Sequence, residues 1–161
     1  MNPSLGALIV LKLKLPLAGV VLAALSFSIT AAADEQAFTW THDDPGLEWG
    51  PCPDYFPAGC AIAVLQGNPE QRNADIFFRL EPGSEVPLHW HSSAERMMLV
   101  SGEFMVDYDG QDPVVMRPGT YAYGPAGLPH TAECRDQGPC VLFIAFEDPV
   151  DAIAGRPHDH Q

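Results

Sequence analysis

The chain has 161 residues, which is the size of one domain and leaves little room for a second. It is strongly acidic, with 21 aspartate and glutamate residues against 8 lysine and arginine residues and a formal charge of −13. A negative field of this size repels phosphate backbones and anionic lipid surfaces. The composition therefore argues against nucleic acid and membrane surfaces as partners.

Residues 1–33 predict a signal peptide. Two lysines precede a mostly apolar run at 15–29, and Ala31 and Ala33 complete the small-residue cleavage pattern, so cleavage is expected before Asp34. A retained membrane anchor is the alternative, but the run is shorter than the ~20 apolar residues that span a bilayer. We expect an exported protein, periplasmic or secreted, with no stable membrane association after cleavage.

The next segment, residues 34–60, is interpreted as an N-terminal extension followed by a loop rich in cysteine and proline. In an oxidising compartment the four cysteines of the chain form two disulfides, for which three connectivities exist. We favour Cys52–Cys60 and Cys134–Cys140, because each pair closes a short loop that holds proline or glycine. A zinc site built from all four cysteines is the alternative, although CxxC spacing is absent.

Residues 61–150 predict one all-β domain. Short runs of strand-forming residues are separated by turn signals such as Pro82-Gly83 and Asp109-Gly110, and no helical period of useful length is sustained. About nine closely spaced strands indicate an antiparallel sandwich or barrel. The remaining residues, 151–161, are expected to form a flexible tail. The expected strands are 61–66, 74–80, 86–91, 95–100, 104–108, 114–116, 121–123, 130–134 and 141–147.

Three histidines and a glutamate form the main candidate site. His89 and His91 are two residues apart, so both side chains leave the same face of a strand, and Glu95 returns beside them after a short turn. A third histidine, His130, opens a later strand, from which it can be aimed at the same point. Imidazole nitrogen and carboxylate oxygen are suitable ligands for a divalent transition metal. The alternative for the first three residues is an exposed H-x-H motif beside an unrelated acid.

The spacing of these residues resembles the two motifs of the cupin family over about residues 61–147. One position departs from the pattern: the second motif often carries asparagine four residues after its histidine, where this chain has Cys134. The matching positions of the first motif are Gly83, His89, His91, Glu95 and Gly102, and those of the second are Gly119, Pro125, Gly127 and His130.

The resemblance implies a double-stranded β-helix, the antiparallel jelly-roll barrel of cupins, with one divalent transition metal ion inside. His89, His91, Glu95 and His130 are the implied ligands. Three neutral imidazoles and one carboxylate around the ion leave a net charge of about +1 and open positions for water, O₂ or a small-molecule oxygen. The ligands do not distinguish Fe, Mn, Zn, Ni and Cu. A relic cupin, which keeps its histidines as packed core residues, is the alternative; a homodimer is expected only by analogy.

Two further residues are candidates for catalysis. Tyr123 can donate a proton or a hydrogen bond near the metal, although a packed barrel aromatic is the simpler interpretation. Arg79 can bind a substrate carboxylate in a bidentate manner, although an arginine on an exposed strand face is the simpler interpretation. His158 and His160 repeat the H-x-H spacing in the tail and can bind metal there, although a disordered end is the simpler interpretation.

Three functions remain open at this stage. The first is an enzyme in which the metal acts as a Lewis acid or oxygen activator on a small molecule; iron favours dioxygenase-type oxidation, and manganese, zinc or nickel leaves isomerisation, lyase chemistry or hydrolysis open. The second is a module that binds a small molecule or metal for sensing, storage or delivery. The third is a metal site with a purely structural role. It is disfavoured, because closed structural sites usually recruit thiolates.

Overall fold

The computed structural model describes residues 36–135 and 137–157, so the predicted signal peptide at 1–33 and the tail histidines His158 and His160 lie outside the described residues. The described ranges contain strands, turns and no helix, and hence no helix with the length and hydropathy of a membrane span. The strands are β1 (Trp49–Pro51), β2 (Ala61–Gln66), β3 (Ala74–Leu80), β4 (Glu85–Trp90), β5 (Glu95–Ser101), β6 (Phe104–Tyr108), β7 (Val114–Met116), β8 (Tyr121–Gly124), β9 (His130–Cys134), β10 (Cys140–Phe146) and β11 (Ile153–Ala154).

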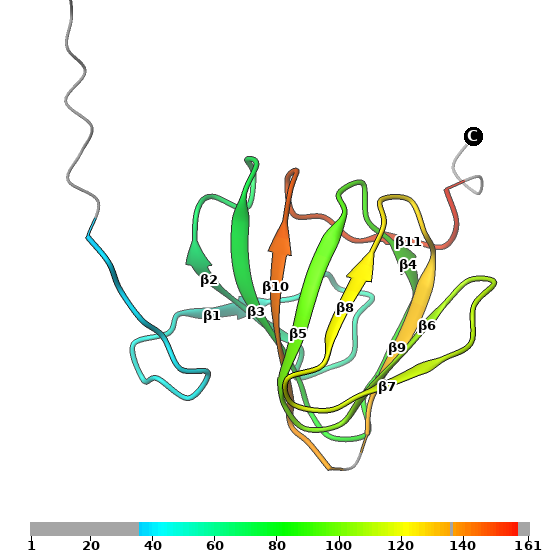
Figure 1. Ribbon diagram of the computed structural model, residues 1–161, viewed down its shortest axis with the longest axis horizontal. Coiled ribbons are helices and arrows are strands. Elements are labelled where there is room, and N and C mark those ends of the chain that lie inside the picture. Colours follow the sequence, from blue (N-terminus) through cyan, green and yellow to red (C-terminus); the bar gives the residue numbers. More distant parts are fainter. Residues whose placement is uncertain (1–35, 136, 158–161) are drawn as a thin grey trace, which may run out of the picture. The chain divides into compact units, whose positions relative to one another are not determined.

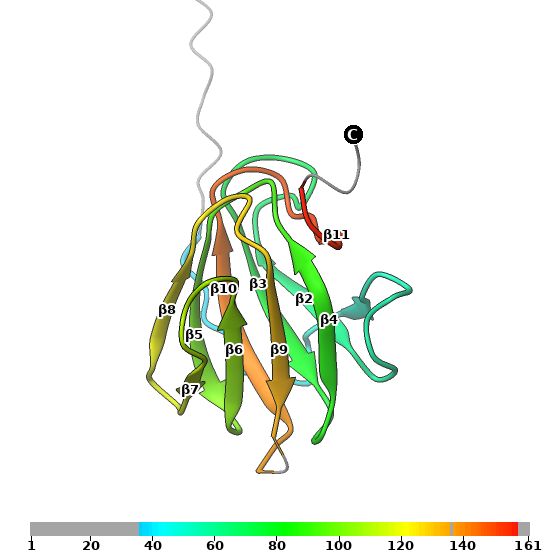
Figure 2. The same ribbon diagram turned by 90° about the vertical axis from the view of Figure 1, so that its right-hand side faces the viewer.

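The strands form two antiparallel sheets that face each other (Figures 1 and 2). One sheet has the order β1-β2-β3-β10-β5-β8, and the other has the order β11-β4-β9-β6-β7. The main hydrophobic core lies between them and includes Leu80, Leu99, Val106, Met116 and Leu142, each at most 1% exposed. The prediction of an all-β, antiparallel double-sheet jelly roll is confirmed.

The nine expected strands are present, each with ends that agree to within one residue. Two short strands were missed. β1 lies inside the expected N-terminal loop and pairs with β2, and β11 lies inside the expected flexible tail and pairs with β4 through Ile153 opposite Trp90. The expectation of a flexible tail is therefore wrong for this part of it, because a backbone ladder attaches the segment to the sheet. β1 and β11 have three and two residues, too few to show an alternating pattern, whereas the equally short β7 was predicted from the turn signals on either side of it.

The six-stranded sheet is covered on both faces at its centre. β10 runs between β3 and β5, and its residue Leu142 faces the main core. On the outer face, Val141 joins Phe77 and Ala63 in a second cluster, against which Leu47 and Trp49 of the N-terminal segment pack. This two-sided burial explains why the sequence of β10 is apolar throughout.

Both favoured disulfides are present. Cys52–Cys60 closes the loop before β2, and Cys134–Cys140 joins the end of β9 to the start of β10, with Cα–Cα distances of 5.6 and 5.7 Å. The structure has no free cysteine among the residues it describes, so the alternative of a four-cysteine zinc site is wrong. Two disulfides are typical of a protein that matures in an oxidising compartment.

Candidate metal centre

The pairing of β4 with β9 brings two histidines face to face. His89 and His130 are direct Cα partners in this antiparallel pair, and their ring centroids are 4.2 Å apart. The ladder is irregular between Val86 and His89, at the position of Pro87, which has no N–H to donate. Because of this irregularity, Val86 and His89, three residues apart, both line the interior.

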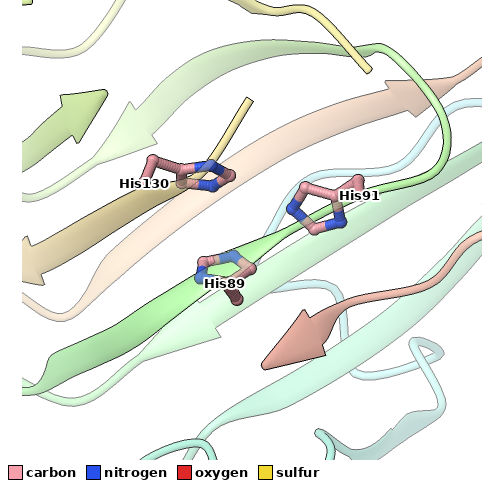
Figure 3. A group of neighbouring side chains, drawn as sticks. All are labelled: His89, His91 and His130. Atoms are coloured by element: carbon pink, nitrogen blue, oxygen red, sulfur yellow. The ribbon is translucent and has the colours of Figure 1, made fainter. Parts of the chain in front are cut away.

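His91 lies one residue beyond the end of β4 and still faces the interior. Its ring centroid is 5.0 Å from that of His89 and 5.3 Å from that of His130 (Figure 3). Its carbonyl oxygen accepts a hydrogen bond of 2.8 Å from the N–H of Gly127, whose φ of 75° favours glycine. This hydrogen bond connects the backbone of the second motif to that of the first. Candidate ligand nitrogens of the three histidines lie within 4.8 Å of one another.

Each of the three imidazoles is oriented by a backbone carbonyl. Nδ1 of His89 donates to Pro87 at 2.8 Å, and Nδ1 of His130 donates to Leu128 at 3.2 Å. Nδ1 of His91 donates to the carbonyl of Asp151, in the segment that leads into β11. Because a carbonyl oxygen only accepts, the proton of each neutral ring is on Nδ1, and Nε2 keeps a free lone pair. This is the arrangement by which metal-binding histidines are usually oriented.

Glu95 reaches this cluster from the opposite sheet. It is the first residue of β5, and its carboxylate oxygens lie 3.6 Å from Nε2 of His91 and 3.4 Å from Nε2 of His130. The strand partner of Glu95 is Gly124, on β8. A Cβ atom at Gly124 would lie 2.7 Å from Oε1 of Glu95 and 2.9 Å from the hydroxyl oxygen of Tyr108, so the missing side chain leaves the space that both groups fill.

Burial determines the protonation of the site. Burial, followed by the neighbouring His130 and His91, lowers the pKa of His89 to about 3, and burial also lowers the pKa of His130. Both rings are therefore neutral near pH 7, as metal coordination requires. Burial, together with the charge of Glu95, raises the pKa of the Tyr108 phenol, which stays protonated.

The residues fit a bound transition metal ion. The three histidines and Glu95 are each at most 8% exposed. Oε1 of Glu95 is buried and lacks a well-aligned hydrogen bond, and the adjacent hydroxyl of Tyr108 is in the same state. A buried carboxylate oxygen without a partner is costly. Three free Nε2 lone pairs beside such an oxygen are the donors that zinc, iron, manganese, nickel or copper accept.

A cavity of about 170 Å³ adjoins these four residues, between the two sheets. Neither of the other proposed catalytic residues lines it. Tyr123 is 52% exposed, because it alternates with the inward-facing Gly124 on β8. The guanidinium carbon of Arg79 stacks 4.0 Å from the ring centroid of Trp49, at the outer face of the six-stranded sheet. The geometry therefore gives no support to a catalytic part for Tyr123 or Arg79.

Three residues at the site were missed by the sequence interpretation. Tyr108 is the strand partner of His130, Gly124 is the partner of Glu95, and Asp151 supports His91 through its carbonyl. For Tyr108 a signal was available, since it lies on the predicted strand 104–108 and alternates there with a less buried neighbour, whereas Gly124 falls one residue beyond the predicted strand 121–123. Asp151 had none, because it depends on a contact across 60 residues of chain.

Comparison with known proteins agrees with this geometry. Residues 76–146 match the family described as a cupin domain. A stretch of 79 residues is 33% identical to oxalate decarboxylase OxdC of Bacillus subtilis, covering 47% of this chain; the chain spans a fifth of the length of that relative. The chain belongs to the cupin superfamily.

Solved structures show the same fold. The structure of an RmlC-like cupin from Shewanella frigidimarina is similar with a TM-score of 0.57 at 22% identity, over 72% of this chain and 93% of that chain. The DMSP lyase DddQ from Ruegeria pomeroyi is similar with a TM-score of 0.59 at 19% identity, over 67% of this chain and 60% of that chain. At these identities the likeness concerns the fold, which hosts unrelated chemistries.

Proposed function

We propose that this protein is an exported cupin that binds one divalent transition metal ion and acts on a small molecule in the adjoining cavity. His89, His91, Glu95 and His130 would hold the ion. The observation that carries the proposal is the buried cluster itself, in which three imidazoles are fixed through Nδ1 and a buried carboxylate oxygen lacks a well-aligned hydrogen bond. Export accords with the two disulfides, and a homodimer remains a prediction.

The residues of the chain prepare the site for such chemistry. Bound at these ligands, a divalent ion supplies Lewis-acid polarisation of an oxygen atom or, if it is iron, oxygen activation of the dioxygenase type. The carbonyls of Pro87, Leu128 and Asp151 hold the imidazole rings in place. Tyr108 keeps its proton on the phenol oxygen beside Glu95, where the hydroxyl can donate to that carboxylate. The apolar wall of the cavity keeps water from the site.

A binding module is the second candidate function. One observation favours it: the cavity wall provides no acid or base besides Asp151 and the four metal-site residues themselves. In a module, the same metal and cavity would capture a small molecule without changing it. The name of the curated relative contains oxalate. This does not decide between an enzyme and a binding module, because the likeness covers only a fifth of that protein.

Elemental analysis of the protein purified from its export compartment tests the proposal. We expect one of iron, manganese, zinc, nickel or copper at close to one ion per chain, and no such ion in a Glu95→Ala, His130→Ala double variant that retains its circular dichroism spectrum. Absence of any near-stoichiometric transition metal in the unaltered protein would overturn the proposal. Mass spectrometry of small molecules incubated with the metal-loaded protein then separates an enzyme, which yields products, from a module, which yields only stoichiometric binding.

A further inference from the structure

The wall of the metal-site cavity is almost entirely apolar. Apart from the four candidate metal ligands, Asp151 is the only polar lining residue in the described part of the chain. The carboxylate of Asp151 already accepts two hydrogen bonds from Ser92, from the N–H at 2.9 Å and from the hydroxyl at 2.5 Å. The rest of the wall consists of side chains such as Ile62, Phe78 and Phe146, which offer a ligand no hydrogen bond.

Among the residues that the structure describes, no lysine or arginine lines this cavity. The chain has no lysine after residue 14, and its six arginines all lie among the residues that the structure describes. Each of them contacts a group away from the cavity. Arg72 pairs with Asp148, Arg79 stacks on Trp49, Arg96 pairs with Glu147, Arg117 pairs with Glu103, Arg135 contacts Met105 and Arg156 pairs with Asp109. A carboxylate or phosphate inside the cavity would therefore find no positive side chain.

An aromatic residue from the disulfide-closed loop completes the wall. Phe56 lies between Cys52 and Cys60, and its ring makes edge contacts with His89 and Phe78, at centroid distances of 5.2 and 6.0 Å. It stands directly beside a candidate metal ligand. An apolar ring in that place gives a bound molecule a surface to stack against and keeps water away from the imidazole.

We propose that the cavity selects a small, uncharged and mostly apolar molecule, about the size of benzene, with a single oxygen directed at the metal site. The contact between that oxygen and a metal ion rests on the proposed function. The selection against charged molecules rests on the cavity wall alone. A cavity of about 150 Å³ lined by leucine, isoleucine and phenylalanine holds benzene, and this one has about 170 Å³. The wall by itself disfavours anionic ligands, because it offers no cation and burying a charge without a partner is costly.

Calorimetric titration of the metal-free protein with benzyl alcohol and with benzoate tests this selection. The two probes share a ring and differ in charge, and without a metal ion only the cavity distinguishes them. We expect benzyl alcohol to bind at least about tenfold more tightly than benzoate at pH 7, a ratio that corresponds to 1.4 kcal/mol. Equal or tighter binding of benzoate would overturn the proposal, and so would a failure of both probes to bind.

Two variants locate the binding in this cavity. Phe56→Ala is expected to weaken benzyl alcohol binding by about fivefold or more, whereas Phe38→Ala, at a residue that is 53% exposed and does not line the cavity, is expected to change nothing. Ala152→Leu is a second variant, for the case that Phe56→Ala disturbs the loop. It narrows the same cavity from the segment that leads into β11 and should weaken binding by a similar factor. Unchanged binding in the folded variants would overturn the proposal.

The zinc-loaded protein separates this inference from the proposed function. Benzyl alcohol is expected to bind it more tightly than it binds the metal-free protein, since its oxygen then contacts the ion. If the protein takes up no zinc and the metal-free form still prefers benzyl alcohol, the proposed function fails and the selection by the wall stands. If the protein takes up zinc but its metal-free form prefers benzoate, the proposed metal function stands and the selection fails.

Discussion

The two faces of β5 carry similar side chains and have opposite roles. Met97 is 3% exposed and lines the cavity, whereas Met98, the next residue, is 42% exposed. Glu95 faces the three histidines, whereas Arg96 faces outward and pairs with Glu147. Residue type is therefore a poor guide to role in this barrel. The side of the sheet on which a residue stands decides whether it can bind, pack or remain in solvent.

The largest difference between an inward-facing and an outward-facing residue is expected for a pair of histidine variants, and it concerns zinc affinity. His130→Ala removes one of the gathered Nε2 donors and should weaken zinc binding by more than about 100-fold, since changes even at groups that only support metal ligands cost 10–100-fold. His42→Ala, in the N-terminal segment, should leave zinc affinity unchanged. Competition with a chelating dye measures both. Equal affinities in the two variants would remove His130 from the site.

A pair of methionine variants compares packing on the two faces. Met97→Ala leaves a cavity in the core and should lower the free energy of unfolding by about 2–5 kcal/mol. Met98→Ala, on the exposed face, should change it by less than about 0.5 kcal/mol. Chemical denaturation with chelator present measures the difference without a contribution from metal binding. Similar losses in both variants would contradict the assignment of the faces.

A pair of glycine variants tests the space beside Glu95. Gly124→Ala places a Cβ atom within 2.9 Å of Glu95 and Tyr108, and the carboxylate must move, so we expect zinc affinity to fall by about 10–100-fold. In Gly50→Ala the nearest heavy atom would be the Ile62 carbonyl oxygen at 3.8 Å, and affinity should not change. If Gly124→Ala binds zinc normally, Glu95 is not held where it can act as a ligand.

The smallest effect is expected at Asp151, whose carboxylate fixes the loop that carries the carbonyl partner of His91. Asp151→Asn keeps the shape and weakens the hydrogen bonds from Ser92, so zinc affinity should fall by about tenfold at most. Asp148→Asn breaks only a surface ion pair with Arg72 and serves as the control. A full effect in the control and none in Asp151→Asn would reverse the roles assigned to these aspartates.

Much of the fold could be predicted because its signals are local. Turn residues delimit the nine longer strands, and short loops hold both disulfides, so neighbours in sequence are neighbours in space. β1 and β11 could not be predicted, because their formation depends on the partner strands β2 and β4 rather than on their own sequences. The same reason explains why Asp151 was assigned to a flexible tail although it contacts His91.

The sequence by itself determined the positions of nine strands and the four candidate metal ligands, and it favoured the disulfide pairs that are present, because motif spacing and side-chain alternation are properties of the chain. Only the tertiary structure decided which face of each strand is inside. It placed Tyr108 beside Glu95 and Tyr123 in solvent, and it enclosed the histidines in a wall without cations. The physical reason is that side-chain alternation separates the two faces of a strand but does not say which face is buried. The closure of two sheets over a common core decides which face is buried.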